Sequence, residues 1–321
     1  MDDPQFSNVC RSIIDEISSV VIIDEEVLVK ILTGFLADGH VLLEDVPGTG
    51  KTLTAQTLAD VLGLSFSRVQ FTPDLLPADI TGTETFDEQS NSFEFRPGPL
   101  FANIVLADEL NRASPKTQAA LLEAMEERQV TVGGESYQLP SPFFVIGTQN
   151  PTESSGTFEL PEAQKDRFMI KTTLGYPDAD GELELIDRRA NRRTRRERVE
   201  RISDSLAIEQ LRNAPEGVTV ERTVRQYVVS IARETRTDDR VAIGVSPRGT
   251  QRLFEAARAY AALSGRDFVT PDEVKAVARP VLTHRIVLTS DARMSGVQKL
   301  DVVEDVIAEQ PVPKLSSRST H

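Results

Sequence analysis

Residues 44–52 read Glu44-Asp45-Val46-Pro47-Gly48-Thr49-Gly50-Lys51-Thr52, and they are the most informative part of the sequence. It follows an apolar run at 40–43 and precedes a helical pattern, so it lies at a strand-to-helix turn, as a phosphate-binding loop does. Gly48 and Gly50 allow consecutive backbone N–H groups to face phosphate oxygens, and the next helix presents its positive end to the same anion. Lys51 would reach the β- and γ-phosphates, and the Thr52 hydroxyl would bind Mg²⁺.

Position 45 departs from the strict phosphate-loop pattern GxxxxGK[ST], which asks for glycine where this chain has Asp45. A carboxylate beside a triphosphate is unfavourable because the two negative charges repel. We therefore expect the side chain of Asp45 to turn away from the phosphates. A glycine-rich turn without a ligand is the alternative interpretation of this stretch taken alone.

A second stretch, Ile104-Val105-Leu106-Ala107-Asp108-Glu109, supports a nucleotide site. Its four apolar residues fit a buried strand, and a parallel strand delivers its last side chains to the carboxyl edge of the sheet, where ligands bind. Asp108 suits Mg²⁺ through a bound water, and Glu109 can accept a proton from an attacking water. The alternative is an Asp-Glu helix cap after a core strand, but the preceding phosphate loop favours the catalytic interpretation.

Four further residues are candidates for the hydrolysis of a triphosphate. Asn150 closes an apolar strand, from which its amide could orient the lytic water; its alternative role is a turn before Pro151. Arg167 and Arg112 could donate charge to the transition state, because a guanidinium is planar and permanently charged. Arg248 opens a helix of the second domain and could reach back to the nucleotide. A local salt bridge or a surface position is the alternative for each arginine.

The whole chain has the composition of a globular protein. Its 321 residues allow one large domain or two smaller ones, and 39% of them are apolar. No run approaches 18 apolar residues and the N-terminus has no basic or apolar leader, so we expect a cytoplasmic protein. Cys10 is the single cysteine, which excludes an internal disulfide. His40, His284 and His321 are too scattered to predict a metal cluster, and we expect packing or surface roles for them.

The charge balance is strongly acidic. Lys and Arg number 36 against 50 Asp and Glu, which gives a net charge of −14 and a surface that repels nucleic acid overall. Only eight of the basic residues are lysine. Because a high-salt cytoplasm selects arginine together with many carboxylates, a halophilic source is a hypothesis.

The predicted elements divide the chain into three parts. Residues 1–176 alternate strands and helices, which predicts an α/β core with a parallel sheet covered on both faces. This part also contains two hairpins, one at 83–96 and one at 129–139 around Gly133-Gly134. Residues 177–293 form a second, all-helical domain, with helices predicted at 182–201, 205–212, 219–236, 248–264 and 271–283. Residues 294–321 lose periodicity and are expected to be a disordered tail.

From about residue 15 to 290 the chain resembles the MoxR group of AAA+ ATPases. The resemblance is carried by four stretches in order, at 42–52, 107–128, 147–151 and 160–168. It implies an AAA+ P-loop NTPase core, whose two hairpins are insertions into helix 2 and before the sensor 1 strand, followed by a helical lid domain. Such proteins act as hexameric remodelling ATPases, commonly with a von Willebrand A-domain partner, in maturing or inserting metals into a client complex.

The resemblance also implies roles for individual residues and the cofactors ATP and Mg²⁺. It gives sensor 1 at Asn150, an arginine finger at Arg167 with Arg112 as the alternative, and sensor 2 at Arg248. The group often has an acidic residue at position 45, but relatives usually have glycine where this chain has Ile23, so adenine contacts are not predicted. The implied nucleotide-binding residues are Asp45, Val46, Pro47, Gly48, Thr49, Gly50, Lys51, Thr52, Leu53 and Asp108, with Thr52 and Asp108 on the metal and Glu109 as the base.

Two other functions are compatible with a phosphate loop. A nucleic-acid motor would use the arginine-rich run at 188–198, but Asp187, Glu197 and Glu200 interleave with that run and aromatic residues for base stacking are absent. An ATP-binding switch or adaptor would not hydrolyse its nucleotide. The presence of Glu109, Asn150 and Arg167 speaks against this second alternative.

Overall fold

A five-stranded parallel sheet organises the N-terminal half of the protein, in the order β2-β5-β8-β1-β9. The computed structural model describes residues 3–89, 91–151, 158, 160–191, 199–202 and 205–313. The strands are β1 (Val41–Glu44), β2 (Phe66–Gln70), β5 (Ile104–Asp108), β8 (Phe144–Gln149) and β9 (Ile170–Thr172). Because all five run in the same direction, their carboxyl ends share one edge of the sheet, as predicted.

Both faces of this sheet are buried. Leu43, Leu106 and Ile146 contribute to one apolar cluster, whereas Leu42 and Val105 contribute to another, since successive side chains of a strand point to opposite faces. The first cluster includes α1 (Asp3–Val20), α2 (Glu25–Leu36) and α3 (Lys51–Leu62), and the second includes α5 (Pro115–Glu127). Near-continuous apolar strands such as β5 therefore follow from burial on both sides.

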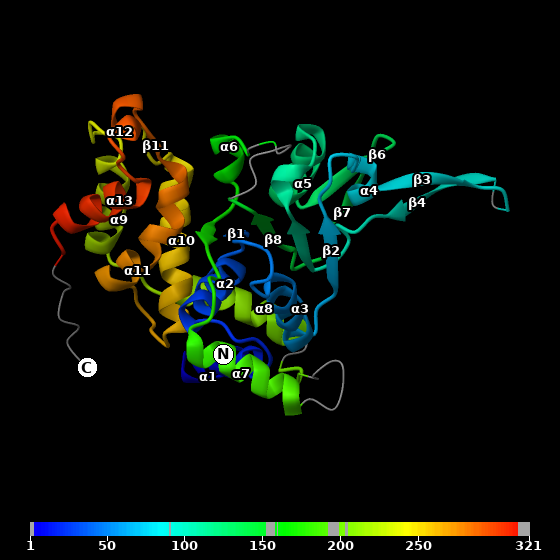
Figure 1. Ribbon diagram of the computed structural model, residues 1–321, viewed down its shortest axis with the longest axis horizontal. Coiled ribbons are helices and arrows are strands. Elements are labelled where there is room, and N and C mark those ends of the chain that lie inside the picture. The colour runs from blue at the N-terminus through cyan, green and yellow to red at the C-terminus, as the bar shows by residue number, and fades with distance from the viewer. Residues whose placement is uncertain are drawn as a thin grey trace.

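Two antiparallel hairpins leave the core where the sequence predicts them. The first joins β3 (Gly82–Asp87) to β4 (Ser92–Pro97) after the short helix α4 (Pro77–Thr81), and the second joins β6 (Gln129–Val132) to β7 (Glu135–Gln138). Figure 1 shows the first hairpin extending away from the body of the molecule. Phe95 stacks on Tyr137 with ring centroids 3.9 Å apart, so the two hairpins support each other at their bases.

The C-terminal half is a predominantly helical lid. Its helices are α7 (Ala179–Asn191), α8 (Ser205–Asn213), α9 (Arg222–Glu234), α10 (Pro247–Leu263), α11 (Pro271–Leu282), α12 (Ser290–Met294) and α13 (Lys299–Glu309). The expectation of a purely helical domain is wrong in one detail, because β10 (Val241–Ile243) pairs antiparallel with β11 (Val287–Leu288). These strands are too short for alternation to distinguish them from helical ends.

The end of the chain differs from its prediction. Residues 294–321 were expected to be disordered, but α13 forms within them and buries Val302, Val303 and Val306 on one face. Their spacing is that of an amphipathic helix, so packing against the lid supplies the stability that a short isolated helix lacks. Residues 314–321 lie outside the described part of the chain.

The lid packs directly on the core. Helix α10 lies along α2 and α1, and residues of both halves share one apolar cluster. Arg188 of α7 also donates hydrogen bonds to the carbonyls of Ser18 and Ser19, at 3.1 and 2.7 Å, at the end of α1. This arginine belongs to the arginine-rich run, of which residues 192–198 lie outside the described residues. No helix in the described ranges has the length and apolar character needed to cross a membrane.

Candidate functional site

The glycine-rich loop joins β1 to α3 in the conformation that a phosphate cradle requires. Gly48 and Gly50 both have φ of +89°, in the left-handed region that residues with a Cβ rarely adopt. Cβ atoms built at these two glycines would meet nothing within 4 Å, so open space adjoins the loop. The Nζ of Lys51 donates to the carbonyls of Asp45 and Val46 at 2.9 and 3.0 Å. The Lys51 side chain therefore lies against the loop in which a phosphate would bind.

Asp45 turns away from the loop, as the departure from the glycine pattern led us to expect. The residue is only 6% exposed, and its carboxylate accepts hydrogen bonds from the backbone N–H groups of Leu174 and Gly175, the latter at 3.2 Å. These two residues follow β9 and lead towards the lid. The carboxylate therefore ties the loop to the connection between the two halves.

Asp108 lies at the carboxyl end of β5 and is almost fully buried. One of its oxygens accepts a hydrogen bond of 2.6 Å from the hydroxyl of Thr148, and the other forms a 2.7 Å ion pair with Arg68. Both partners come from strands next to β5 in the sheet. They hold the carboxylate at the sheet edge, where its oxygens could serve as ligands for Mg²⁺.

Glu109 follows directly and has a left-handed backbone, with φ of 59°. Its backbone N–H donates to Thr148 at 2.8 Å, while its carboxylate accepts from Gln70 at 2.5 Å. Arg112 forms an ion pair with the same carboxylate at 3.1 Å. The local salt bridge that was the alternative role for Arg112 is therefore present, and it lies beside the candidate base.

Asn150 completes the carboxyl edge. It follows β8, which lies between β5 and β1 in the sheet, and it is 6% exposed. The structure thus brings Asp108, Glu109 and Asn150 to the same edge as the glycine loop. Thr52 is half-buried in the first turn of α3, and Leu53 beside it is 46% exposed. A triphosphate on the loop could share Mg²⁺ between the Thr52 hydroxyl and Asp108.

Three residues at this edge were not predicted. Thr148 contacts both acidic residues, and Arg68 and Gln70 each hold one of them. Arg68 and Gln70 alternate with the buried Val69 on β2, so their pattern indicates a solvent-facing side of a strand but not what they contact. The partners become visible only when the strand order places β2 beside β5.

Arg167 and Arg248 lie at the opposite, amino edge of the sheet. The guanidinium of Arg167 contacts one oxygen of Glu126 at 3.1 Å, and that of Arg248 contacts the other at 2.9 Å. With Gly39 and His40, which precede β1, these three residues line a cavity of about 570 Å³. The four residues of β1 separate the two edges by about 13 Å. The expectation that Arg248 reaches back to the nucleotide of its own chain is therefore wrong.

The reason lies in how the lid packs. Helix α10 begins at Pro247 after the cap residue Ser246, whose hydroxyl accepts a hydrogen bond from the Gly249 N–H at 3.1 Å. The same helix runs along α2, which ends at the amino edge of β1. The first turn of α10, with Arg248, therefore lies at the amino edge of the sheet. Sequence periodicity predicts the helix but not the side of the core on which it packs.

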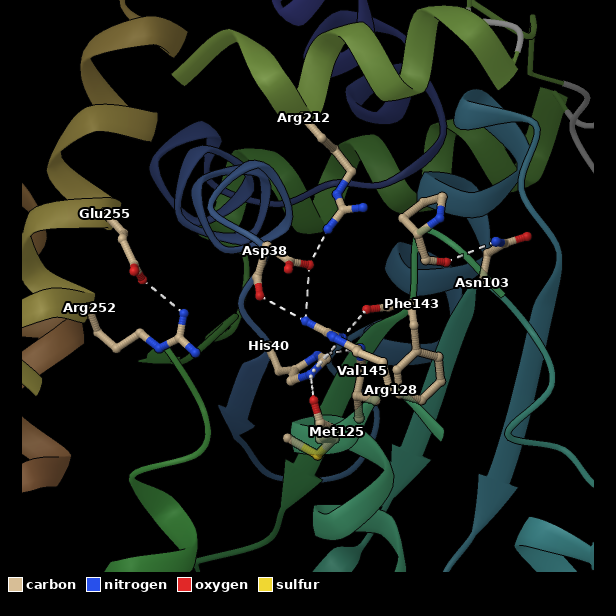
Figure 2. Close-up of polar contacts among 11 residues, drawn as sticks. Asp38, His40, Asn103, Met125, Arg128, Phe143, Val145, Arg212, Arg252 and Glu255 are labelled. Carbon is tan, nitrogen blue, oxygen red and sulfur yellow. Dashed lines mark hydrogen bonds and ion pairs between the residues drawn. The ribbon is translucent and has the colours of Figure 1, made fainter. Parts of the chain in front are cut away.

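Figure 2 shows the polar network of this amino edge. Arg128 follows α5 and donates to the carbonyls of Asp38 and Phe143 at 2.8 and 2.6 Å. His40 accepts from the Val145 N–H at 3.0 Å and donates to the Met125 carbonyl at 3.2 Å. Burial, and then the charge of Arg128, hold the pKa of His40 well below its usual value. The histidine is a neutral packing residue, as expected.

Two lid residues fix the backbone around Arg167. The Arg285 guanidinium, 1% exposed, donates to the carbonyls of Phe168 and Met169 at 2.8 and 3.1 Å and pairs with Asp166. Burial lowers the pKa of Arg285 to about 10. His284 donates to the same Phe168 carbonyl at 2.9 Å, and burial lowers its pKa. Nothing in the sequence distinguishes Arg285 from a surface arginine.

Comparison with known proteins places both halves in one family. Residues 40–170 match the family model "ATPase family associated with various cellular activities (AAA)", and residues 233–306 match the AAA lid domain. Chaperone MoxR1 of Mycobacterium tuberculosis is 39% identical over 94% of this chain and 82% of its own length. Uncharacterized protein YeaC of Bacillus subtilis is 44% identical over 94% of this chain and 93% of its own length. The crystal structure of a Cytophaga hutchinsonii protein assigned as an ATPase has a TM-score of 0.90 at 38% identity and covers 97% of both chains.

Proposed function

The chain belongs to the MoxR group of AAA+ ATPases, and on this premise we propose that it hydrolyses ATP with Mg²⁺ in a closed ring and uses the energy to remodel other proteins. The observation that carries this proposal is the separation of the candidate residues between two edges of the sheet. The carboxyl edge holds the phosphate loop with Asp108, Glu109 and Asn150. The amino edge holds Arg167 and Arg248.

The carboxyl edge supplies binding and the attack on the γ-phosphate. Lys51 exchanges the loop carbonyls for the β- and γ-phosphates, and loop amides bind the remaining oxygens. Thr52 and Asp108 would hold Mg²⁺, which when bound would neutralise charge on the phosphates. Glu109 takes a proton from the attacking water that Asn150 orients. The contacts of Gln70 and Thr148 keep Glu109 at this edge before the nucleotide binds.

The amino edge supplies charge to a neighbouring chain. Arg167 and Arg248 cannot contact the loop of their own chain, so we assign them to the nucleotide of the next protomer, as finger and sensor 2. Such a head-to-tail contact is heterologous and must close into a ring, for which we propose a hexamer. A finger arginine contributes on the order of 10³–10⁵ to the hydrolysis rate.

The output of the ring is proposed to be chaperone-like. The name Chaperone MoxR1 of the relative supports this class of activity. We propose a von Willebrand A-domain protein as partner and the maturation of a client complex, including metal insertion, as the task. Cells of high internal salt remain the proposed setting, in view of the net charge of −14.

The test begins with phosphate release by the purified protein with ATP and Mg²⁺. The variant Glu109→Gln should bind ATP without releasing phosphate, and Arg167→Ala should bind ATP normally while turnover falls about 10³-fold or more. Rapid hydrolysis by Glu109→Gln would remove Glu109 as the base. Near-normal turnover by Arg167→Ala would move the finger role to Arg112. A von Willebrand A-domain protein that co-purifies with Glu109→Gln only in ATP would support the proposed partner.

A further inference from the structure

We propose that Glu126 is a positioning residue that holds Arg167 and Arg248 together as one phosphate-recognising unit; this inference rests on the proposed function. Glu126 lies in the last turn of α5. Its two carboxylate oxygens contact the two guanidinium groups separately, at 3.1 and 2.9 Å. One side chain thereby joins an arginine of the core to an arginine of the lid.

The surrounding charges make Glu126 the shared partner of both arginines. Four arginines line this cavity, and its other two carboxylates already pair elsewhere, Asp38 with Arg128 and Glu255 with Arg252. Within the described ranges, neither Arg167 nor Arg248 has a second carboxylate within 4.0 Å. Without the charge of Glu126, two like charges would face each other across the cavity and separate.

The contact leaves both guanidinium groups able to bind phosphate. An arginine has five N–H donors, and each of these arginines directs one Nη to Glu126. All three side chains are about one-third exposed, so the cluster is open to solvent. Holding two long side chains in one geometry beforehand reduces the entropy lost when they contact the γ-phosphate in the transition state, so the effect is on kcat. Glu126 therefore acts on the reaction through the two arginines without touching the nucleotide.

The decisive experiment mixes two variants, one slowed and one unable to hydrolyse ATP. In Glu126→Gln the amide offers one acceptor oxygen in place of two, so one arginine loses its partner, and we expect kcat to fall about 10- to 100-fold. KM for ATP, ring assembly and Tm should match those of Glu127→Gln, a change of the adjacent exposed residue, which has no side-chain hydrogen bond or ion pair to any residue that the structure describes. Glu109→Gln cannot hydrolyse its own ATP but presents intact arginines to its neighbour.

Equal mixing should restore turnover to about a quarter of the wild-type rate, because about one site in four combines an intact Glu109 with a neighbour that has an intact Glu126. A mixture no faster than the average of its two components would overturn the inference, since a defect confined to its own chain is not rescued. Arg167→Ala mixed with Glu109→Gln is the control for the proposed function itself. If the control mixture is rescued but the Glu126→Gln mixture is not, the role of Glu126 is rejected and the proposed function stands. If neither mixture is rescued, the proposal that sites are shared between chains is rejected.

Discussion

Replacing Thr148 by valine tests how the acidic pair is held at the sheet edge. Valine has nearly the shape of threonine, so Thr148→Val removes the hydroxyl and leaves the packing of this fully buried residue unchanged. The hydroxyl donates to Asp108 at 2.6 Å and accepts from the backbone N–H of Glu109 at 2.8 Å. The variant therefore loses one hydrogen bond to a charged group and leaves one partly buried N–H without its partner.

The expected cost follows from these two contacts. A hydrogen bond to a charged group contributes about 1.5–3 kcal/mol, and an unsatisfied buried donor costs about 1–3 kcal/mol. We expect the free energy of unfolding, measured by chemical denaturation at fixed protein concentration, to fall by about 3 kcal/mol. ATP turnover should fall more than about tenfold, because the left-handed Glu109 loses the contact that fixes its backbone.

Thr131→Val is the matched control, since among the residues that the structure describes the exposed Thr131 hydroxyl bonds only to the exposed Ser136, at 3.3 Å. This control should change the free energy of unfolding by less than about 0.5 kcal/mol. If Thr148→Val is no more destabilising than Thr131→Val, the two contacts do not hold the acidic pair. If it is destabilising but turns over ATP at the wild-type rate, the orientation of Glu109 does not depend on Thr148.

Two further predictions concern the buried basic residues. Burial lowers the pKa values of His40 and His284, so the unfolded chain binds more protons below pH about 6.5, and stability falls as the pH falls. Each histidine should contribute a loss of about 1.4 kcal/mol between pH 7.5 and 5.5. His40→Gln should remove its share from the measured pH profile, and an unchanged profile would show that folding does not lower the pKa of His40. Arg285→Met should lower the free energy of unfolding by about 3–5 kcal/mol, because Asp166 and several carbonyls lose their partner; denaturation that matches an exposed control such as Arg222→Met would contradict a structural role for Arg285.

The parts of the fold that the sequence predicts are those set by local physics. The hairpin turn at Gly133-Gly134 is one example. The start of α5 is another, because the sequence Ser114-Pro115 by itself indicates a cap residue followed by a first-turn proline. In each, a short run of residues determines its own conformation through turn geometry or a side-chain cap. The carboxyl edge of the site was also predictable, because strand ends in a parallel sheet must meet there.

The amino edge was not predictable, because tertiary packing decides it. The position of Arg248 depends on which side of the core α10 packs against, and no residue near Arg248 in the sequence indicates that side. Arg285 binds backbone carbonyls of a segment more than 100 residues earlier in the chain. Helix α13 has a helical pattern, but it is short and follows an irregular stretch, so only its burial against the lid distinguishes it from a tail.

The carboxylate of Asp45 has a mechanical consequence. It clasps the backbone of Leu174 and Gly175, which lead out of β9 towards α7. If the glycine loop shifts when Lys51 exchanges carbonyls for phosphate, one of two things must follow. Either residues 174–175 move with the loop, or their hydrogen bonds to Asp45 break. Asp45, which replaces the usual first glycine, thus links the phosphate loop to the segment that leads into the lid. Through this link, a movement of the loop at one edge of the sheet can be transmitted to the second half of the molecule.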